Sequence, residues 1–205
     1  MSLFLIALAA IFSVINPLGT VPIFVGLTKE KTKKEINKIA LATAINVLII
    51  LLISFYLGKF ILLFFGISLN SLKIAGGLII ASSGFALLTG KFSQHKGMNE
   101  KNKNAAMERD EVSLTPLAIP MLAGPGTISL LITYHQEYTQ VLERGILTAA
   151  ILVISVLIYI TLRSSNLIIK ALGPNGINAL SRIIGFIVIA IGVEYILSTV
   201  ILLLK

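Results

Sequence analysis

The chain contains 205 residues, of which 56% are hydrophobic and 13% are charged, and its net charge at pH 7 is +8. Soluble domains contain about 45–50% apolar and about 25% charged residues. So few charges cannot cover the surface of a soluble fold, and the chain is too apolar to stay disordered. The composition therefore excludes both classes and indicates an integral membrane protein. The absence of cysteine excludes disulfides, zinc–thiolate sites and iron–sulfur clusters.

Long apolar segments follow one another along almost the whole chain. A helix needs about 20 apolar residues to cross about 30 Å of hydrocarbon. Six segments meet this requirement, at residues 1–28, 39–64, 74–90, 112–135, 145–162 and 183–204. The first segment carries its charges after the apolar stretch, which favours an uncleaved span over a signal peptide. We expect an all-α polytopic membrane protein of six transmembrane helices, with residues 1–205 forming a single transmembrane domain.

The basic residues are distributed unevenly between the predicted loops. The first, third and fifth loops contain 12 Lys and Arg residues, whereas the opposite side contains three, Lys59, Arg144 and Lys205. Cytoplasmic loops carry the excess of Lys and Arg in membrane proteins. We therefore expect these three loops in the cytoplasm and both termini outside. The +8 charge then reports orientation and contact with the lipid bilayer, and it requires no nucleic acid partner.

The second half of the chain repeats the first at an offset of about 108 residues. The segment Lys73–Gly76 corresponds to Arg182–Gly185, and a charged segment separates the two halves. We expect a first repeat at 1–90, a cytoplasmic linker at 91–111 and a second repeat at 112–205. Because each repeat has three spans, the second enters the membrane from the opposite side, as in many secondary transporters with inverted-topology repeats.

Five of the six prolines lie in the first span of a repeat. Proline beside glycine interrupts a helix, and the freed backbone groups must then be buried in protein or line a wet cavity. The N-terminus of the following half-helix attracts anions such as carboxylates. Ordinary proline kinks are the alternative. We predict that substrate binds near the bilayer midplane at the two Pro-Gly sites, which comprise Asn16, Pro17, Gly19, Thr20, Gly124, Pro125, Gly126 and Thr127.

Several other residues stand out within the predicted spans. Glu194 is the only acid inside one, and we predict a role in ion coupling, with a structural acid near the outer interface as the alternative. Lys73 and Arg182 occupy equivalent positions and act either as gates or counter-ions or as side chains that reach the interface. Small residues spaced seven apart predict close packing of the third and sixth spans, namely Gly76, Gly77, Ser83, Gly84, Gly185 and Gly192. His95 and His135 are not accompanied by other metal-ligating residues, so we predict no metal site.

These features resemble the MarC family of integral membrane proteins. The resemblance rests on six spans in two halves, the sequence Asn16-Pro17-Leu18-Gly19, the segment 120–127 with Gly124-Pro125-Gly126, and the charged central linker. It covers nearly the whole chain. The second motif lacks the asparagine of the first, so the two sites are not strictly equivalent. The resemblance implies a multi-pass protein of the plasma (inner) membrane of a prokaryote and, for part of the family, transport of small neutral amino acids such as glycine or alanine.

We interpret the chain as a secondary transporter of small neutral amino acids, coupled to H⁺ or Na⁺. No nucleotide-binding or enzyme motif is present, so we predict neither a cofactor nor an enzymatic activity. A passive channel or exporter for small solutes is the alternative, because such channels also pair broken helices on inverted halves. The sequence leaves the substrate, the coupling ion, the direction of transport and the formation of homo-oligomers open.

Overall fold

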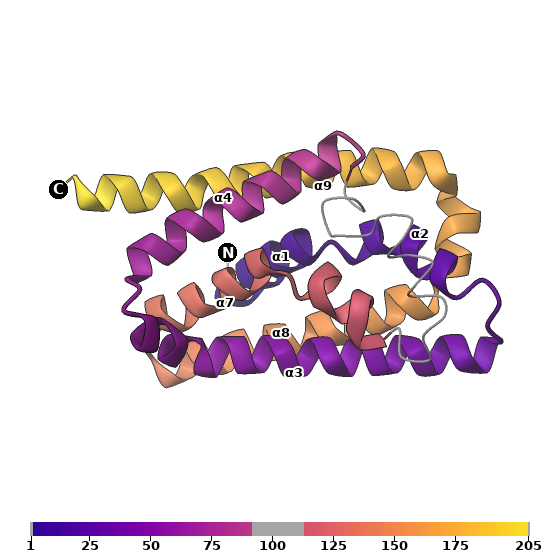
Figure 1. Cartoon of the computed structure of the whole chain (residues 1–205), viewed down its shortest axis with the longest axis horizontal. Coiled ribbons are helices and arrows are strands. Elements are labelled where there is room, and N and C mark those ends of the chain that lie inside the picture. Colours follow the sequence, from indigo (N-terminus) through magenta and orange to yellow (C-terminus); the bar gives the residue numbers. More distant parts are fainter. Residues whose placement is uncertain (1, 92–112, 205) are drawn as a thin grey trace.

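A computed structural model of the chain describes residues 2–91 and 113–204. Every regular element within these two ranges is a helix, which confirms the all-helical class for this part of the chain. The predicted linker and His95 lie outside the described residues, apart from Lys91. In chain order (Figure 1), the elements are α1 Leu3–Ile15, α2 Pro17–Leu27, α3 Lys33–Phe65, α4 Leu69–Leu88, the π-helix η1 Ser113–Leu122, α7 Pro125–Glu137, α8 Val141–Arg163 and α9 Ser165–Leu203.

Within the described residues, five helical segments are long and apolar enough to cross a membrane. They are Leu3–Leu27, Lys33–Phe65, Leu69–Leu88, Val141–Arg163 and Asn175–Leu203. This finding confirms a polytopic membrane protein. The remaining predicted span, 112–135, contains η1 and α7, which have 10 and 13 residues and are each too short to cross alone. A sixth crossing therefore stays a prediction.

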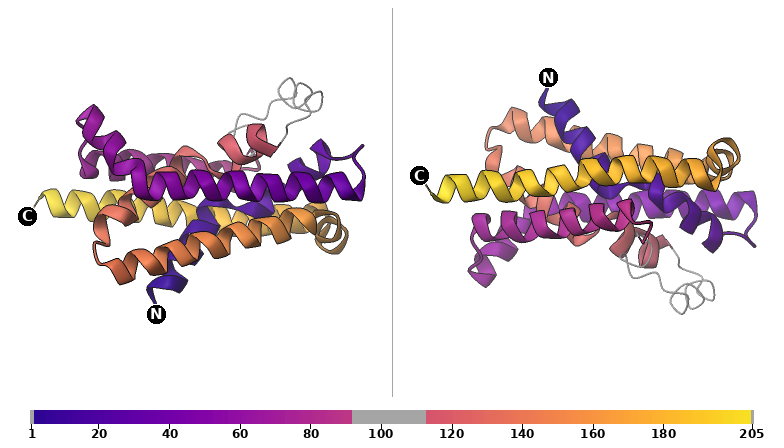
Figure 2. Two further views of the ribbon diagram at one scale, coloured as in Figure 1. Left: turned by 90° about the horizontal axis from the view of Figure 1, so that it is seen from below. Right: turned by 90° about the horizontal axis from the view of Figure 1, so that it is seen from above.

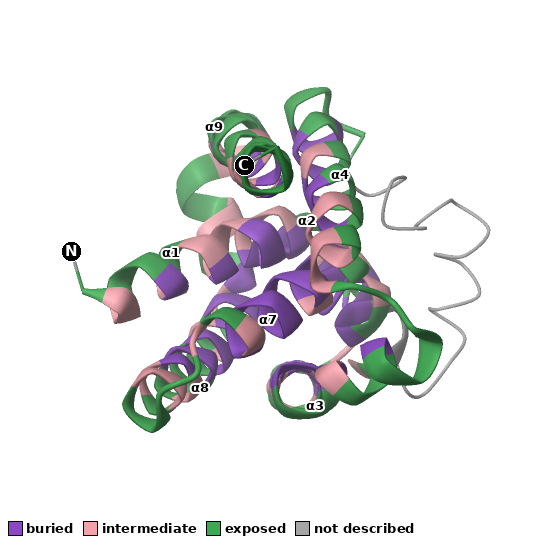
Figure 3. Cartoon of the chain, turned by 90° about the vertical axis from the view of Figure 1, so that its left-hand side faces the viewer, coloured by how far each residue is buried: buried purple, intermediate pink, exposed green. Residues whose placement is uncertain are grey.

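The interrupted helices lie between two pairs of long helices. Seen from one end, α4 and α9 form one side, α3 and α8 form the other, and α1, α2 and α7 lie between them (Figure 3). Contacts of α7 with α3 and α4, of α1 with α8 and of α2 with α9 hold this arrangement together. Buried residues face the middle of the bundle (Figure 3), so the interrupted helices supply much of the protein core.

The outer faces of the long helices are strongly apolar. Leu63, Phe64 and Phe65 of α3 are between 67% and 83% exposed, and similar side chains cover the outside of α4, α8 and α9. Such a large exposed apolar surface is untenable in water but is what a membrane-embedded surface requires.

Helix α9 begins earlier than the sequence analysis indicated. Residues 163–182 were expected as a loop before the last span, yet Ser165–Leu203 is helical, with a bend at Gly173, whose φ is 65°. Glycine adopts this left-handed conformation without the steric cost that a Cβ adds. A loop was expected because these residues separate the fifth and sixth apolar segments and include Arg163 and Lys170. The structure instead continues as a helix on both sides of the bend.

Helices α4 and α9 are antiparallel and form the most extensive helix–helix contact among the described elements (Figures 1 and 2). A Cβ added to Gly192 would lie 2.6 Å from the carbonyl oxygen of Gly77, and one added to Gly84 would lie 2.7 Å from that of Gly185. Only glycine permits backbones to approach this closely. The predicted packing of the third and sixth spans is therefore confirmed, although Gly76 faces Ser129 of α7 instead.

The first prediction concerns this glycine contact. We expect Gly192→Ala to destabilise the protein by about 1–3 kcal/mol, because its methyl group would push backbone against backbone. Gly145→Ala is the matched control, since a Cβ on this helical glycine of α8 meets no atom within 4 Å. Thermal unfolding in detergent measures the difference. Equal midpoints for the two variants would contradict the role of Gly192.

Candidate functional site

The first interruption is the single residue Asn16, between α1 and α2. Asn16 has φ 48° and ψ 65°, a left-handed conformation that asparagine adopts more readily than most residues. Its side-chain oxygen accepts a hydrogen bond of 3.2 Å from the backbone N–H of Gly19. Pro17 then begins α2, where its missing N–H costs nothing. In the Asn-Pro-Leu-Gly sequence, Asn16 is therefore the only residue between the end of α1 and the start of α2.

The first interruption is buried inside the protein. Asn16 and Thr20 are both 0% exposed, and the Thr20 hydroxyl lies 3.5 Å from the Asn16 carbonyl oxygen. The side-chain nitrogen of Asn16 has no hydrogen-bond partner among the described residues. This nitrogen occupies the place where a Cβ on residue 19 would lie, so the Asn16 side chain would have to shift if Gly19 were replaced. A buried donor without a partner costs about 1–3 kcal/mol, which a ligand or water could recover.

The second interruption, residues 123–124, lies between η1 and α7. The prolines in η1 lack the N–H groups of a regular α-helix, and Ala123 donates to the carbonyl of Ala118, five residues back, at 2.8 Å. Gly124 is extended and has no side chain to cap α7, which begins at Pro125. The buried Thr127 hydroxyl lies 3.4 Å from the carbonyl oxygen of Leu122. Gly126 packs close to Ile80 of α4.

The two interrupted segments run side by side. Helix α1 contacts α7, and α2 contacts η1. The first helix of each segment thus contacts the second helix of the other segment. The two segments are therefore antiparallel to each other. The eight predicted binding residues accordingly belong to two neighbouring segments, and the helices of these segments, α2 and α7, lie in the middle of the bundle (Figure 3).

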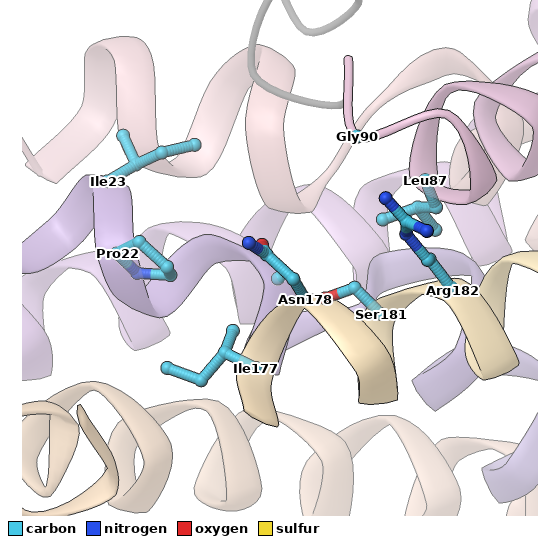
Figure 4. A pocket seen from close by; sticks show the side chains of 9 residues that line it. Pro22, Ile23, Leu87, Gly90, Ile177, Asn178, Ser181 and Arg182 are labelled. Atoms are coloured by element: carbon cyan, nitrogen blue, oxygen red, sulfur yellow. The ribbon is translucent and has the colours of Figure 1, made fainter. Parts of the chain in front are cut away.

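A pocket of about 180 Å³ adjoins the first interruption. It lies between α2, the last turn of α4 and the first part of the straight segment of α9 (Figure 4). One water needs only about 10–15 Å³ of such volume, so the pocket has room for a small ligand. Its lining residues are Gly19, Pro22, Ile23, Leu87, Gly90, Ile177, Asn178, Ser181 and Arg182. Sequence reasoning singled out Gly19 and Arg182 but missed Asn178 and Ser181, which fell within an expected loop.

The equivalent basic residue at the opposite end of α4 is already neutralised. The Lys73 ammonium nitrogen lies 2.6 Å from the Oε1 atom of Glu137, and the two side chains are only 12% and 37% exposed. Next to this ion pair, the Ser129 hydroxyl donates to the carbonyl of Leu72 at 3.2 Å. The ammonium also lies 5.9 Å from the centre of the Tyr195 ring. Lys73 is therefore a paired residue that joins α4 to α7 at this end.

Glu194 lies away from both interruptions. The residues of α9 that face the bundle include Gly185, Val188 and Gly192, whereas Glu194 is on the exposed side of the helix. Two residues beyond Gly192 the helix has turned by about 200°, which explains this position. In the single chain the Glu194 side chain is therefore exposed. Its proposed part in ion coupling stays a prediction.

His135 is buried near the end of α7 in a small aromatic cluster. Its ring centre lies 5.1 Å from that of Phe55 and 5.9 Å from that of Tyr56, both in edge-on geometry. Within the described ranges, no group of three or more His, Cys, Asp or Glu residues is placed to hold a metal ion. In the structure, His135 thus packs against the aromatic rings of α3.

Comparison with known proteins assigns the chain to a family. The model of the MarC family of integral membrane proteins matches residues 1–204. The chain belongs to the MarC family. It is 38% identical to the UPF0056 membrane protein MJ1677 of Methanocaldococcus jannaschii over 195 residues, which cover 95% of this chain and 94% of that protein.

Two further MarC-family relatives are bacterial. The UPF0056 inner membrane protein MarC of Citrobacter koseri is 34% identical, with 98% of this chain and 95% of that protein covered. The UPF0056 membrane protein YhcE of Escherichia coli is 33% identical, with 92% and 87% covered. These names describe integral membrane proteins and state no transported compound. No solved structure matches the chain.

The second prediction concerns the left-handed residue at the first interruption. We expect Asn16→Ala to be less stable than Asn16→Gly by about 1 kcal/mol or more, because alanine loses the cap and also strains the backbone at positive φ. Glycine loses the cap alone. Thermal unfolding of both variants in one detergent measures the difference. If Asn16→Ala were as stable as Asn16→Gly, the left-handed conformation would not be what position 16 requires.

The third prediction concerns the Lys73–Glu137 ion pair. We expect Lys73→Glu and Glu137→Lys each to lower stability, and the double variant to recover about 0.5–1 kcal/mol beyond the sum of the two effects. The recovery arises because the exchanged charges can pair again. A double-mutant cycle of thermal unfolding measures this coupling. Strictly additive effects would show that the pair contributes no interaction energy.

Proposed function

We propose that the protein is a secondary transporter of small neutral amino acids, such as glycine or alanine, coupled to H⁺ or Na⁺. In this proposal the chain forms six spans in two inverted repeats in the inner membrane of a prokaryote, with both termini outside. Substrate binds near the midplane at the two interruptions. Membership of a family of integral membrane proteins and the excess of Lys and Arg in three loops support this arrangement.

The observation that carries the proposal is the buried first interruption and the pocket beside it. Non-helical backbone at membrane depth is tolerated where it is buried in protein or lines a cavity. Here Asn16 is fully buried with an unpartnered side-chain nitrogen, and Gly19 separates this nitrogen from the pocket. Discontinuous helices that meet substrate at their exposed backbone ends are typical of secondary transporters.

The difference between the two ends of α4 also supports transport. In the proposed orientation, the Lys73–Glu137 pair closes the outer end, whereas the pocket with Arg182 faces the cytoplasm. A transporter that alternates its access has one side closed while the other is open. The described structure fits an inward-facing state of such a cycle.

Glu194 is our candidate for ion coupling. An exposed acid on a membrane-facing helix is costly unless it is protonated, paired or close to the interface. Gly77 of α4 packs against Gly192 and near Tyr195, which places Glu194 about one helical turn from the level of Lys73.

The fourth prediction tests transport directly. Proteoliposomes that contain the purified protein should accumulate labelled glycine or alanine, with a saturable rate, when a H⁺ or Na⁺ gradient is imposed. An ionophore that collapses the gradient should abolish the accumulation, because the substrate has no other energy source. Glu194→Gln should remove the response to a H⁺ gradient, since the amide cannot carry a proton.

The outcomes of this experiment separate the possible functions. Absence of accumulation under either gradient, with correctly inserted protein, would reject the transporter. Rapid osmotic swelling with small solutes and no saturation would indicate the passive channel instead. Unchanged pH-driven uptake by Glu194→Gln would remove only the role assigned to that residue.

A further inference from the structure

Among the described residues, the pocket beside the first interruption is lined by one basic side chain and by no acid. On α9, Asn178 lies three residues before Ser181 and four residues before Arg182, so it is next to both on the helix surface, and all three line the pocket. In Figure 4 their side chains surround the pocket opposite Pro22 and Ile23 of α2. None of the nine lining residues is an aspartate or glutamate. The fixed guanidinium charge therefore gives this pocket a positive potential.

The charge on Arg182 is left unneutralised within the described residues. The only ion pair among the described residues joins Lys73 to Glu137. Lys73 occupies the position equivalent to Arg182. Arg182 is exposed, whereas the Lys73 side chain is 12% exposed. Of these two equivalent basic positions, Lys73 is therefore paired with a carboxylate, whereas Arg182 has no carboxylate partner among the described residues.

The remaining lining residues indicate how large the ligand is. Ile23, Leu87 and Ile177 make the apolar part of a pocket of about 180 Å³, which limits a bound side chain to a small apolar group. Asn178 and Ser181 supply oxygen atoms that can accept hydrogen bonds from an ammonium group. Behind Gly19, the buried Asn16 side chain has an unpartnered nitrogen. This buried donor lies next to the pocket but does not line it.

We propose that Arg182 anchors the carboxylate of a small amino acid in the pocket formed by α2, α4 and α9. A guanidinium group binds a carboxylate through two parallel N–H···O bonds, which gives both strength and orientation. Asn178 and Ser181 contact the ammonium group, and the small apolar side chain lies against Ile177. This inference rests on the proposed function, and it adds the residue that recognises the carboxylate on the cytoplasmic side.

The experiment is ligand-induced thermal stabilisation of the purified full-length protein. Glycine carries both charged groups, acetate lacks the ammonium group, and glycinamide lacks the carboxylate. We expect glycine and acetate to raise the unfolding midpoint and glycinamide to have no effect, because binding stabilises the folded state by mass action. Arg182→Gln should weaken glycine binding by about tenfold or more, since it removes a charge-assisted contact. Arg182→Lys should retain part of the affinity.

Arg163→Gln is the matched control. It removes the same charge from an exposed arginine at the end of α8, whose guanidinium contacts Tyr159 and does not line the pocket. It should leave glycine affinity unchanged. The unfolding midpoint of each variant without ligand shows whether it is folded. If Arg182→Gln does not fold, Asn178→Ala and Arg182→Lys provide the same comparison, with a smaller expected loss of affinity.

Three outcomes would overturn the inference. They are equal affinity of Arg182→Gln and the unchanged protein for glycine, stabilisation by glycinamide as strong as that by glycine, and no stabilisation by glycine or acetate. Failure of the proposed function looks different. Acetate binding that depends on Arg182, without glycine accumulation in proteoliposomes, would leave the anchor in place and reject the transporter. Glycine uptake with an unchanged KM in Arg182→Gln would reject the anchor alone.

Discussion

The architecture depends on the requirement that no backbone N–H or C=O group faces lipid without a partner. Each unsatisfied group in hydrocarbon costs several kcal/mol. The two interruptions expose such groups, so they lie in the middle of the bundle, between the α3–α8 pair and the α4–α9 pair. The uninterrupted helices, whose backbone bonds are satisfied internally, form the surface that meets the lipid. Burial of Asn16 and Thr127 is a consequence of this requirement.

The same requirement explains why the interruptions have different chemistry. Asn16 satisfies one backbone donor of α2 with its own side chain, so that interruption needs only one residue. Gly124 has no side chain to do this, and the preceding segment winds instead as a π-helix with a bond from Ala123 to Ala118. The absence of an asparagine in the second motif thus has a structural counterpart. The two interruptions correspond in sequence position, but each is closed by different hydrogen bonds.

The sequence predicted those features that follow from local chemistry or from periodicity. Asn16 before Pro17 is a local signal, and the structure places the end of a helix there. Glycines seven apart indicate a stripe on one face, and Gly185 and Gly192 meet α4 as expected. The side of α9 on which Glu194 lies depends on the rotation of the helix about its own axis, which the apolar pattern of the span did not predict, and the role of Glu194 stays a prediction. The polar lining of the pocket was missed because Asn178 and Ser181 lie between the fifth and sixth apolar segments, where a loop was expected, whereas the structure includes them in α9.

The close contact between α4 and α9 connects the two ends of the molecule. Glycine contacts at two levels hold these backbones together, so the pair can move only as one body. Near one end of this body, Lys73 is bound to Glu137 of α7, and near the other end, Arg182 lines the pocket against α2. In the proposed transport cycle, we expect that a tilt of the pair that separates Lys73 from Glu137 also brings Arg182 toward α2, so that one side opens as the other closes. The coupling between the two gates then requires no signal through the interruptions, because it follows from the rigidity of the glycine contact.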